Sequence, residues 1–257
     1  METNRRLMLM IDGDNAQAAL LPQMLTEVNK YGVIKIRRVY GDWSSPNLKP
    51  WRDILHTYAL KPEQQFSYTS GKNATDIALI IDAMDFINSA GVDGICIVSS
   101  DSDYTPLATR IREKNLFVMG IGRRGTPQAF VKACDVFVYT DILSSEVEDV
   151  ISEIPLPMNR AENESVAEVR SVTVDDKSHS GGLFRSAFDA AVQDDGWAHL
   201  GTFGSSLRQQ DPGFDPRTYG YKLLSQLVQA DPNFFEIQKR ASKGGNTDIY
   251  IRLKVDA

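Results

Sequence analysis

Apolar runs alternate with amphipathic stretches over the first 143 residues of this chain, and in several runs successive residues are all hydrophobic. A strand with one face in water alternates apolar and polar side chains, whereas a strand covered on both faces is apolar at successive positions. The pattern therefore predicts an α/β domain with a doubly wound, mainly parallel sheet between layers of helices. The predicted strands are Leu7–Ile11, Ile34–Tyr40, Gln65–Thr69, Gly94–Ser99, Leu116–Ile121 and Val136–Tyr139.

The composition changes after residue 143. Residues 144–180 contain many acidic residues, two prolines (Pro155 and Pro157) and few large apolar side chains. Such a segment buries too little apolar surface to hold a fixed structure. We therefore predict a first domain at 1–143 and an acidic flexible linker at 144–180.

Residues 181–257 follow a different plan. Three short helical stretches, at about 183–193, 200–210 and 217–229, come before two β-like runs that a loop joins. Three helices followed by a terminal hairpin are typical of winged helix-turn-helix modules. We predict a small α+β winged-helix domain here. The β-like runs are Phe234–Gln238 and Asp248–Leu253.

The net charge of −6 is carried by the linker rather than by the two domains. Residues 1–143 hold 16 basic and 16 acidic residues, residues 144–179 hold 3 and 9, and residues 180–257 hold 9 and 9. The acidic balance of the whole chain therefore does not argue against nucleic-acid binding by either domain.

Hydropathy and cysteine content predict a cytoplasmic chain without membrane contact. The longest apolar runs fall far short of the ~20 residues that a membrane span needs. The apolar stretch before Asp12 is too short for the core of a signal peptide. Cys96 and Cys134 have neither disulfide nor metal-site spacing, so we expect two buried thiols in a reducing compartment.

Acidic residues follow two of the predicted strands at the point where each strand ends. Asp12 follows the first strand, and Asp101 and Asp103 follow the fourth. In the common strand order 3-2-1-4-5, strands one and four are neighbours where the order reverses, and ligands bind at that point. A further acid, Asp76, lies in the first turn of the helix after strand three. We therefore expect these four carboxylates to gather at one edge of the sheet.

Converging carboxylates repel one another unless a cation neutralises them, and hard oxygen ligands favour Mg²⁺ or Mn²⁺. We expect Asp12, Asp76 and Asp101 to be the metal ligands. Such a metal can clamp a phosphodiester oxygen and activate a water, as hydrolysis of that bond requires. His56 is the one histidine of the first domain, which leaves little support for a histidine-based scheme.

Small polar and basic residues accompany the acids on the same predicted edge. The polar ones suit hydrogen bonds to a substrate phosphate, and the basic ones suit a polynucleotide backbone. Plain helix capping and plain solvation are the alternative interpretations. The substrate-binding candidates of this domain are Asn15, Lys72, Thr75, Ser100, Arg123 and Arg124.

Single aspartates at strand-to-helix junctions are often only N-caps, and Asp14, Asp101 and Asp103 are each open to that interpretation. It is the joint placement of several acids that favours a functional site. Asp82 and Asp85 lie further along the helix and are expected to form a solvated face.

Asp12-Gly13-Asp14 after a first strand also resembles the nucleophile motif of haloacid-dehalogenase-type phosphatases, in which the first aspartate attacks phosphorus. Asn15 departs from the threonine or valine that this motif has next. A phosphatase therefore stays a minor alternative.

Several motifs of the first domain occur together in one known family. They are Ile11-Asp12-Gly13-Asp14-Asn15, Lys72 with Asp76, Ser99-Ser100-Asp101-Ser102-Asp103-Tyr104 and Ala133-Cys134-Asp135-Val136-Phe137. With these motifs, residues 5–143 resemble the NYN family of PIN-like ribonucleases, the LabA-like group. The resemblance implies a metal-dependent RNase fold with Asp12, Asp76, Asp101 and Asp103 at the family's acidic positions.

The second domain carries a further set of motifs. They are Asp195-Gly196-Trp197-Ala198-His199-Leu200, Leu207, Phe214-Asp215-Pro216-Arg217-Thr218-Tyr219-Gly220, Leu223-Leu224, Phe234-Phe235 and Ile249-Tyr250-Ile251-Arg252-Leu253. Over about 181–256 the chain resembles the OST-HTH or LOTUS domain, which implies RNA binding and, for some members, docking of a protein partner.

Large apolar residues of this domain are expected in its core, by helical spacing and size. They are Trp197, Leu200, Phe203, Leu207, Phe214, Tyr219, Leu223 and Leu227. The cations are the candidate RNA contacts, together with the third helix. They are Arg217, Lys222, Lys239, Arg240 and Lys243.

Together these features predict a metal-dependent endoribonuclease that acts on single-stranded or structured RNA, with a second domain that binds or selects the RNA. The alternative is a non-catalytic RNA-binding adaptor that keeps the acidic fold. A protein partner for the second domain and a homo-oligomer are both compatible with the sequence.

Overall fold

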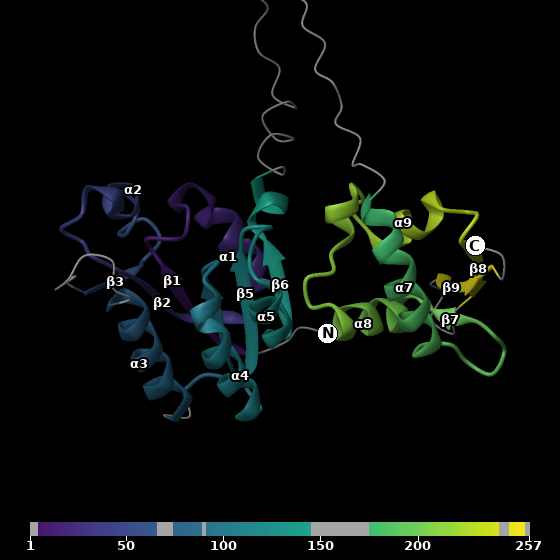
Figure 1. Ribbon diagram of the computed structural model, residues 1–257, viewed down its shortest axis with the longest axis horizontal. Coiled ribbons are helices and arrows are strands. Elements are labelled where there is room, and N and C mark those ends of the chain that lie inside the picture. Colours follow the sequence, from purple (N-terminus) through teal and green to yellow (C-terminus); the bar gives the residue numbers. More distant parts are fainter. Residues whose placement is uncertain (1–4, 66–73, 89–90, 145–174, 242–246, 255–257) are drawn as a thin grey trace, which may run out of the picture. The chain divides into compact units, whose positions relative to one another are not determined.

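The computed structural model describes residues 5–65, 74–88, 91–144, 175–241 and 247–254. The chain divides into two compact units, Met1–Glu146 and Val147–Ala257, which Figure 1 draws in purple to teal and in green to yellow. Each unit is described by itself. None of the helices in the described ranges has the length and apolar character that crossing a bilayer demands.

The first unit is built on a six-stranded sheet of order β3-β2-β1-β4-β5-β6, in which all neighbouring strands pair in parallel. β1 and β4 are neighbours where the order reverses, as predicted. The doubly wound α/β fold is therefore confirmed. The strands are β1 (Arg6–Asp12), β2 (Val33–Gly41), β3 (Lys61–Gln64), β4 (Gly94–Val98), β5 (Phe117–Gly122) and β6 (Val136–Tyr139).

The helices of this unit cover both faces of the sheet. They are α1 (Leu21–Asn29), α2 (Lys49–Arg52), α3 (Ala74–Asn88), α4 (Thr105–Glu113) and α5 (Gln128–Ala133). Short 3-10 turns accompany them. These are η1 (Ala18–Leu20), η2 (Pro46–Leu48) and η3 (Ser102–Tyr104).

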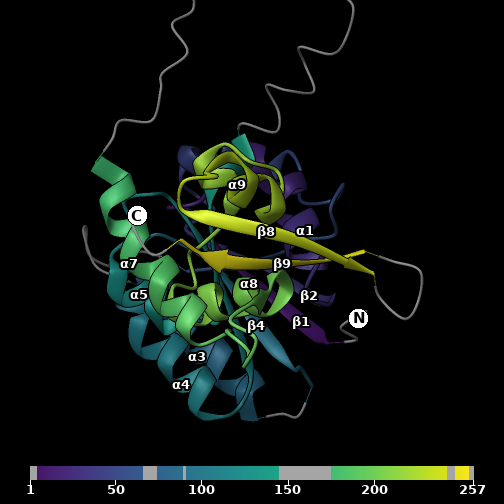
Figure 2. The same cartoon turned by 90° about the vertical axis from the view of Figure 1, so that its right-hand side faces the viewer.

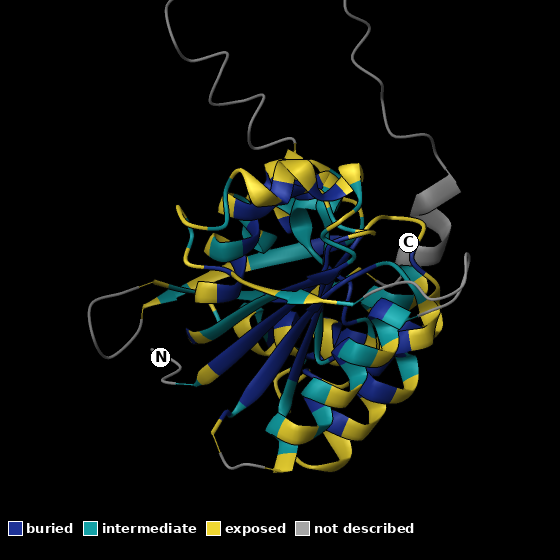
Figure 3. Cartoon of the chain, turned by 90° about the vertical axis from the view of Figure 1, so that its left-hand side faces the viewer, coloured by how far each residue is buried: buried dark blue, intermediate teal, exposed yellow. Residues whose placement is uncertain are grey.

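Strand β1 sends alternate residues into two separate core clusters. Leu7, Leu9 and Ile11 pack in the cluster that includes α1, while Met8 and Met10 pack in the cluster that includes α3, α4 and α5. All five side chains are fully buried, and Figure 3 shows the central strands in dark blue between partly exposed helices. Burial on both faces explains why this run is apolar at successive positions.

The third strand differs from its predicted position. We expected it at Gln65–Thr69, whereas β3 spans Lys61–Gln64 and pairs with Arg38–Gly41 of β2. Residues 66–69 lie outside the described ranges. β3 is an edge strand with a polar, proline-containing sequence, so hydrophobic patterning does not mark it.

Asp82 is not a merely solvated residue, in contrast to our expectation. Arg38 of β2 donates to the Asp82 carboxylate at 2.6 Å, and the Tyr40 hydroxyl donates to the same oxygen. The Arg38 guanidinium also lies 5.0 Å from the centre of the Phe86 ring. These contacts fasten α3 to the sheet. Asp85, one residue before Phe86, is exposed as expected.

The second unit is a small α+β domain with a terminal antiparallel hairpin, as predicted, and a short further strand completes a sheet of order β7-β9-β8. Figure 2 shows its long strands β8 and β9 side by side. Its elements are α7 (Asp175–Asp189), β7 (Ala198–His199), α8 (Leu200–Gln210), η4 (Pro216–Tyr219), α9 (Leu224–Ala230), β8 (Phe235–Ala241) and β9 (Thr247–Leu253). The buried aromatic centre includes Phe203, Phe214 and Phe235.

Several expectations for this unit were wrong. The predicted helix 217–229 is interrupted, because Gly220 adopts a left-handed conformation with φ of 83° between η4 and α9. Leu223, in the interruption, is 58% exposed instead of buried. Trp197 is half-buried outside the core, because the next residue, Ala198, takes the buried position.

Helix α7 begins at Asp175, inside the predicted linker. The other predicted linker residues, from 145 on, lie outside the described ranges, so the linker stays a prediction.

We expect Arg38→Gln to lower the free energy of unfolding by about 1–3 kcal/mol, since it leaves the partly buried Asp82 and Glu63 carboxylates without their shared cation. Urea denaturation followed by tryptophan fluorescence measures the change. Arg110→Gln is the matched control, because Arg110 and Glu113 are both half exposed and such pairs contribute about 0.5 kcal/mol or less. Equal stability of the two variants would contradict the fastening role of Arg38.

Candidate active site at the carboxyl edge of the sheet

Asp12 is the last residue of β1 and is 1% exposed. Its carboxylate accepts hydrogen bonds from Asn15 Nδ2 at 2.7 Å, Ser99 Oγ at 3.0 Å and the Asp14 backbone N–H at 3.2 Å. These donors are all neutral, so they orient the carboxylate without balancing its charge.

The pKa of Asp12 is raised. Burial is the main cause, and the negative charges of Asp76 and Asp14 add to it, while the hydrogen bonds from Asn15 and Ser99 act in the opposite direction. Ionisation of this carboxyl group is therefore less favourable in the folded protein than in water, and a bound cation would reduce that difference in free energy.

Gly13 allows the chain to turn tightly after Asp12. The Gly13 N–H donates to the Tyr40 carbonyl at 2.9 Å, and the Gly13 carbonyl accepts from Trp51 Nε1 at 3.2 Å. A Cβ at this position would lie 2.9 Å from the Tyr40 oxygen, too close for any side chain. The Asp-Gly-Asp-Asn sequence is thus a turn pinned to β2, with Asp14 exposed beyond it.

Tyr104, at the end of η3, connects the acids of different elements. Its buried hydroxyl donates to Asp76 Oδ1 of α3 at 2.6 Å. Burial and the nearby charges of Asp12, Asp76 and Asp101 raise the pKa of this phenol, so it stays protonated at neutral pH. Three of the predicted acids therefore lie around one tyrosine.

Ser99 connects β4 to β1 in a similar way. Its hydroxyl donates to Asp12 and accepts from the Asp101 backbone N–H at 3.1 Å. Asp101 caps η3 by accepting from the Asp103 N–H at 2.9 Å, and Asp103 is exposed. Sequence reasoning did not assign Ser99 and Tyr104 to the site, although both belong to the Ser-Ser-Asp-Ser-Asp-Tyr motif that it quoted.

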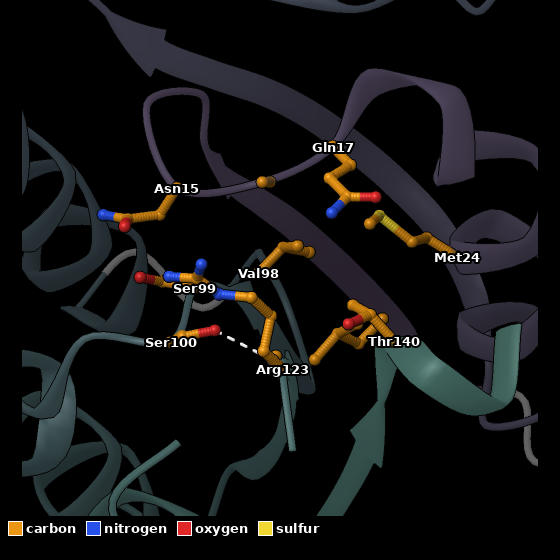
Figure 4. Close-up of a pocket in the computed structure, with 11 residues that line it drawn as sticks. Asn15, Gln17, Met24, Val98, Ser99, Ser100, Arg123 and Thr140 are labelled. Atoms are coloured by element: carbon orange, nitrogen blue, oxygen red, sulfur yellow. Dashed lines mark hydrogen bonds between the residues drawn. The ribbon is translucent and has the colours of Figure 1, made fainter. Parts of the chain in front are cut away.

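A small open pocket lies next to the acids. Asn15, Ser99 and Ser100 line it together with Arg123 and Thr140, as Figure 4 shows. Ser100 Oγ accepts from the Arg123 backbone N–H at 2.8 Å, which ties the loop after β5 to the end of β4.

The other predicted substrate residues have different placements. Thr75 is buried and donates to Asp14 at 3.4 Å. Arg124 is exposed, and its backbone N–H donates to Asp141 at 3.0 Å. Lys72 lies outside the described residues.

The metal site stays a prediction. Within the described ranges, the structure shows no group of three or more His, Cys, Asp or Glu side chains placed to hold a metal ion. The donor set still has the chemistry that Mg²⁺ or Mn²⁺ prefers, since Asp12, Asp76 and Asp101 supply only oxygen ligands. Burial, with a smaller contribution from the charges of Asp76 and Asp14, raises the pKa of Asp12, and a bound cation would favour its ionised form.

Residues 6–145 match the NYN domain, over more than half of the chain. This chain belongs to the NYN family. Residues 175–247 match the OST-HTH/LOTUS domain. NYN domains belong to the PIN-like nuclease superfamily and OST-HTH/LOTUS domains bind RNA, so the chain has the architecture of a nuclease-like, RNA-related protein.

Solved structures are similar to parts of the NYN chain. A Vibrio parahaemolyticus protein of unknown function shares 19% identity over 54% of this chain and 94% of its own, with a TM-score of 0.45. An uncharacterized Nitrosomonas europaea protein shares 29% identity over 40% of this chain and 95% of its own, with a TM-score of 0.31.

A Chromobacterium violaceum protein shares 37% identity over 30% of this chain and 83% of its own, with a TM-score of 0.26. No match is found among curated proteins.

In the OST-HTH/LOTUS unit, the predicted RNA contacts differ in how exposed their side chains are and in whether those side chains already have partners. Arg217 donates to the neighbouring Asp215 through Nε at 3.1 Å and Nη2 at 2.8 Å, and its side chain is 18% exposed. Lys222 and Lys239 are exposed, whereas Lys243 lies outside the described residues. Arg240 lies on the sheet, where aromatic side chains surround it.

We expect Asp12→Asn to raise the melting temperature by a few degrees at pH 7. Because folding raises the pKa of Asp12, the folded protein binds a proton at this carboxyl group more tightly than the unfolded chain does. The resulting stabilisation of the fold is fully present below the unfolded pKa of about 3.9 and is lost as the pH rises through the folded pKa. Asparagine carries no charge, so the melting temperature of Asp12→Asn should exceed that of the unmodified chain at pH 7, and this difference should disappear below about pH 4.

Thermal melts in a chelator at both pH values measure this difference. Asp85→Asn makes the same chemical change at an exposed site and should leave both melting temperatures unchanged. A lower melting temperature for Asp12→Asn at pH 7 would show that the Asp12 charge is balanced in the folded state.

Proposed function

We propose that the NYN unit is an Mg²⁺- or Mn²⁺-dependent endoribonuclease. The observation that carries the proposal is the buried Asp12 carboxylate, whose pKa burial and neighbouring acids raise, at the point where the strand order of the sheet reverses. Open α/β sheets bind their ligands at this point. An enzyme that neutralises this charge with a cation gains a centre that attracts phosphate oxygens.

Asp12, Asp76 and Asp101 would hold the metal. When bound, such a metal polarises the phosphodiester and lowers the pKa of a water, which is the chemistry that hydrolysis requires. The residues of this chain orient the ligands: Asn15 and Ser99 hold Asp12, and Tyr104 holds Asp76. Asp103 is exposed at the same edge and is assigned a supporting catalytic role.

The pocket beside the acids would receive the RNA backbone. Arg123 supplies a cation at its rim, and Asn15, Ser100 and Thr75 supply neutral donors close to the carboxylates. Lys72 and Arg124 are assigned to the flanking phosphates. The OST-HTH/LOTUS unit would bind or select the RNA, with Arg217 and Lys222 among its contacts.

A non-catalytic RNA-binding adaptor is the second candidate. The specific observation in its favour is that the described acids form no ready group of three metal ligands. The phosphatase alternative has less support, because the Asp12 carboxylate is buried and already accepts three hydrogen bonds, which is unfavourable for an attacking nucleophile. The buried free thiols of Cys96 and Cys134 agree with a cytoplasmic location.

Cleavage of a circular RNA tests the proposal, because only an endonuclease opens it. We expect cleavage with Mg²⁺ or Mn²⁺ and none with a chelator. Asp12→Asn and Asp101→Asn should each lower the rate at least about a hundredfold, or about 2.7 kcal/mol of transition-state stabilisation. Asp85→Asn is the matched control and should cleave like the unmodified chain.

A second readout does not depend on activity. Mn²⁺ should raise the melting temperature of the unmodified chain and of Asp85→Asn, but not that of Asp12→Asn. RNA binding without cleavage at any metal concentration would support the adaptor instead. Turnover of a small phosphomonoester with a trapped aspartyl-phosphate at Asp12 would support the phosphatase.

A further inference from the structure

The antiparallel sheet of the OST-HTH/LOTUS unit has one face in the core and one face away from it. Phe235 of β8 and Ile251 of β9 are buried in the core, and Ala198 of β7 is buried beside them. Because side chains alternate along a strand, the residues between these positions lie on the opposite face. We call them the outer sheet face. It comprises His199, Glu236, Gln238, Arg240, Tyr250 and Arg252, with Trp197 at its edge.

Guanidinium groups and aromatic rings stack on the outer sheet face. The Arg240 guanidinium lies 4.2 Å from the centre of the Tyr250 ring and 5.7 Å from that of Trp197. The Arg252 guanidinium lies 4.8 Å from the Trp197 ring. His199 adds a further ring, with its centre 5.3 Å from that of Tyr250. Planar groups thus follow one another across three strands.

Each guanidinium is held in place by an acid. Arg240 donates to Asp195 at 2.8 Å, and Arg252 donates to Glu236 at 2.6 Å. The arginine side chains are 33% and 47% exposed, so the stack is preorganised but still accessible to a ligand. Exposed ion pairs of this kind contribute little to stability, and a phosphate can replace the carboxylate as partner.

We propose that the outer sheet face binds single-stranded RNA by stacking unpaired bases on Trp197, Tyr250 and the two guanidinium planes. This inference rests on the proposed RNA substrate of the chain. Aromatic side chains on an open sheet, with arginines beside them, are the groups on which proteins stack unpaired bases. A duplex has its bases stacked internally and offers no free base faces, so single strands are the matching ligand.

The composition of the face favours RNA over a protein partner. The large aliphatic side chains that this unit exposes in its described part, Val192 and Leu223, belong to neither β8 nor β9. An amphipathic protein segment docks its apolar side chains into a hydrophobic groove. The outer sheet face consists of charged, amide and aromatic side chains instead. The acids beside Arg240 and Arg252 also keep the face nearly neutral, so stacking supplies most of the affinity and the salt dependence should be weak.

Binding of a fluorescent single-stranded RNA 20-mer of mixed sequence to the full chain, in a chelator, measures the affinity without cleavage. We expect Trp197→Ala to weaken binding about tenfold, and Arg240→Lys, which keeps the charge but loses the planar group, to weaken it several-fold. Tyr250→Phe keeps the ring, so its affinity should fall much less than that of Trp197→Ala. Arg208→Gln removes an exposed cation from α8, outside the outer sheet face, and should have little effect.

A crosslinking experiment guards against loss of folding in the variants. An RNA that contains 4-thiouridine, irradiated with the unmodified chain, should attach within residues 195–199 or 248–252, as mass spectrometry identifies. Crosslinks confined to Arg217, Lys222 or the NYN unit would overturn the inference.

Unchanged affinity of Trp197→Ala and Arg240→Lys would also overturn it, and would leave a protein partner as the alternative occupant of the face. Cleavage is measured on circular RNA with Mg²⁺ or Mn²⁺, whereas stacking is measured by binding in a chelator, so either proposal can fail without the other.

Discussion

The burial of a charged carboxylate at the end of a doubly covered strand is the constraint on which the NYN unit depends. β1 is buried on both faces, so its last residue, Asp12, is buried as well. An unbalanced charge in such a place costs several kcal/mol in folded proteins. Among the described residues, the hydrogen bonds that limit this cost come from the neutral donors Asn15, Ser99 and the Asp14 backbone. A bound cation would lower this cost, which is the physical basis of the proposed metal site.

The surrounding polar residues act as connections between elements. Ser99 connects β1 to β4, Tyr104 connects η3 to α3, and the Arg38–Asp82 pair connects α3 to β2. The position of Asp76 relative to Asp12 is therefore set by packed elements and not by loops alone. Rigid support of this kind is what a catalytic constellation needs, because small displacements of a ligand set change its chemistry strongly.

The two units present different kinds of surface to RNA. The NYN edge combines the buried Asp12 and its neighbouring acids with a small open pocket, which is where the metal and the phosphate are proposed to bind. The OST-HTH/LOTUS sheet combines rings and guanidinium planes, which suit bases. Contacts to phosphate position a nucleic acid, whereas contacts to bases select it. Under the proposed function, the second unit would select the RNA and the first would act on its backbone.

Much of this organisation can be read from the amino-acid sequence, because strong hydrophobic periodicity and residue type act locally. The apolar run of β1, the acids after β1 and β4, and the helix that begins near Asp76 were all predicted at the places where the structure has them. The edge strand β3 was misplaced, since a polar strand with one neighbour carries no hydrophobic signal. The left-handed Gly220, which interrupts the third helix, was also missed.

Contacts between distant residues were decided only by the tertiary structure. The sequence alone determined which side chains carry charge and which strands are buried. It did not determine that Asp82 binds Arg38, that Tyr104 reaches Asp76, or that Trp197 leaves the core to stack with Arg240 and Arg252. Such pairs join residues that are far apart in the chain, and their formation depends on how strands align and helices dock. The hydrophobic periodicity of one segment does not specify how it aligns with distant segments, so only the packed fold brings these groups together.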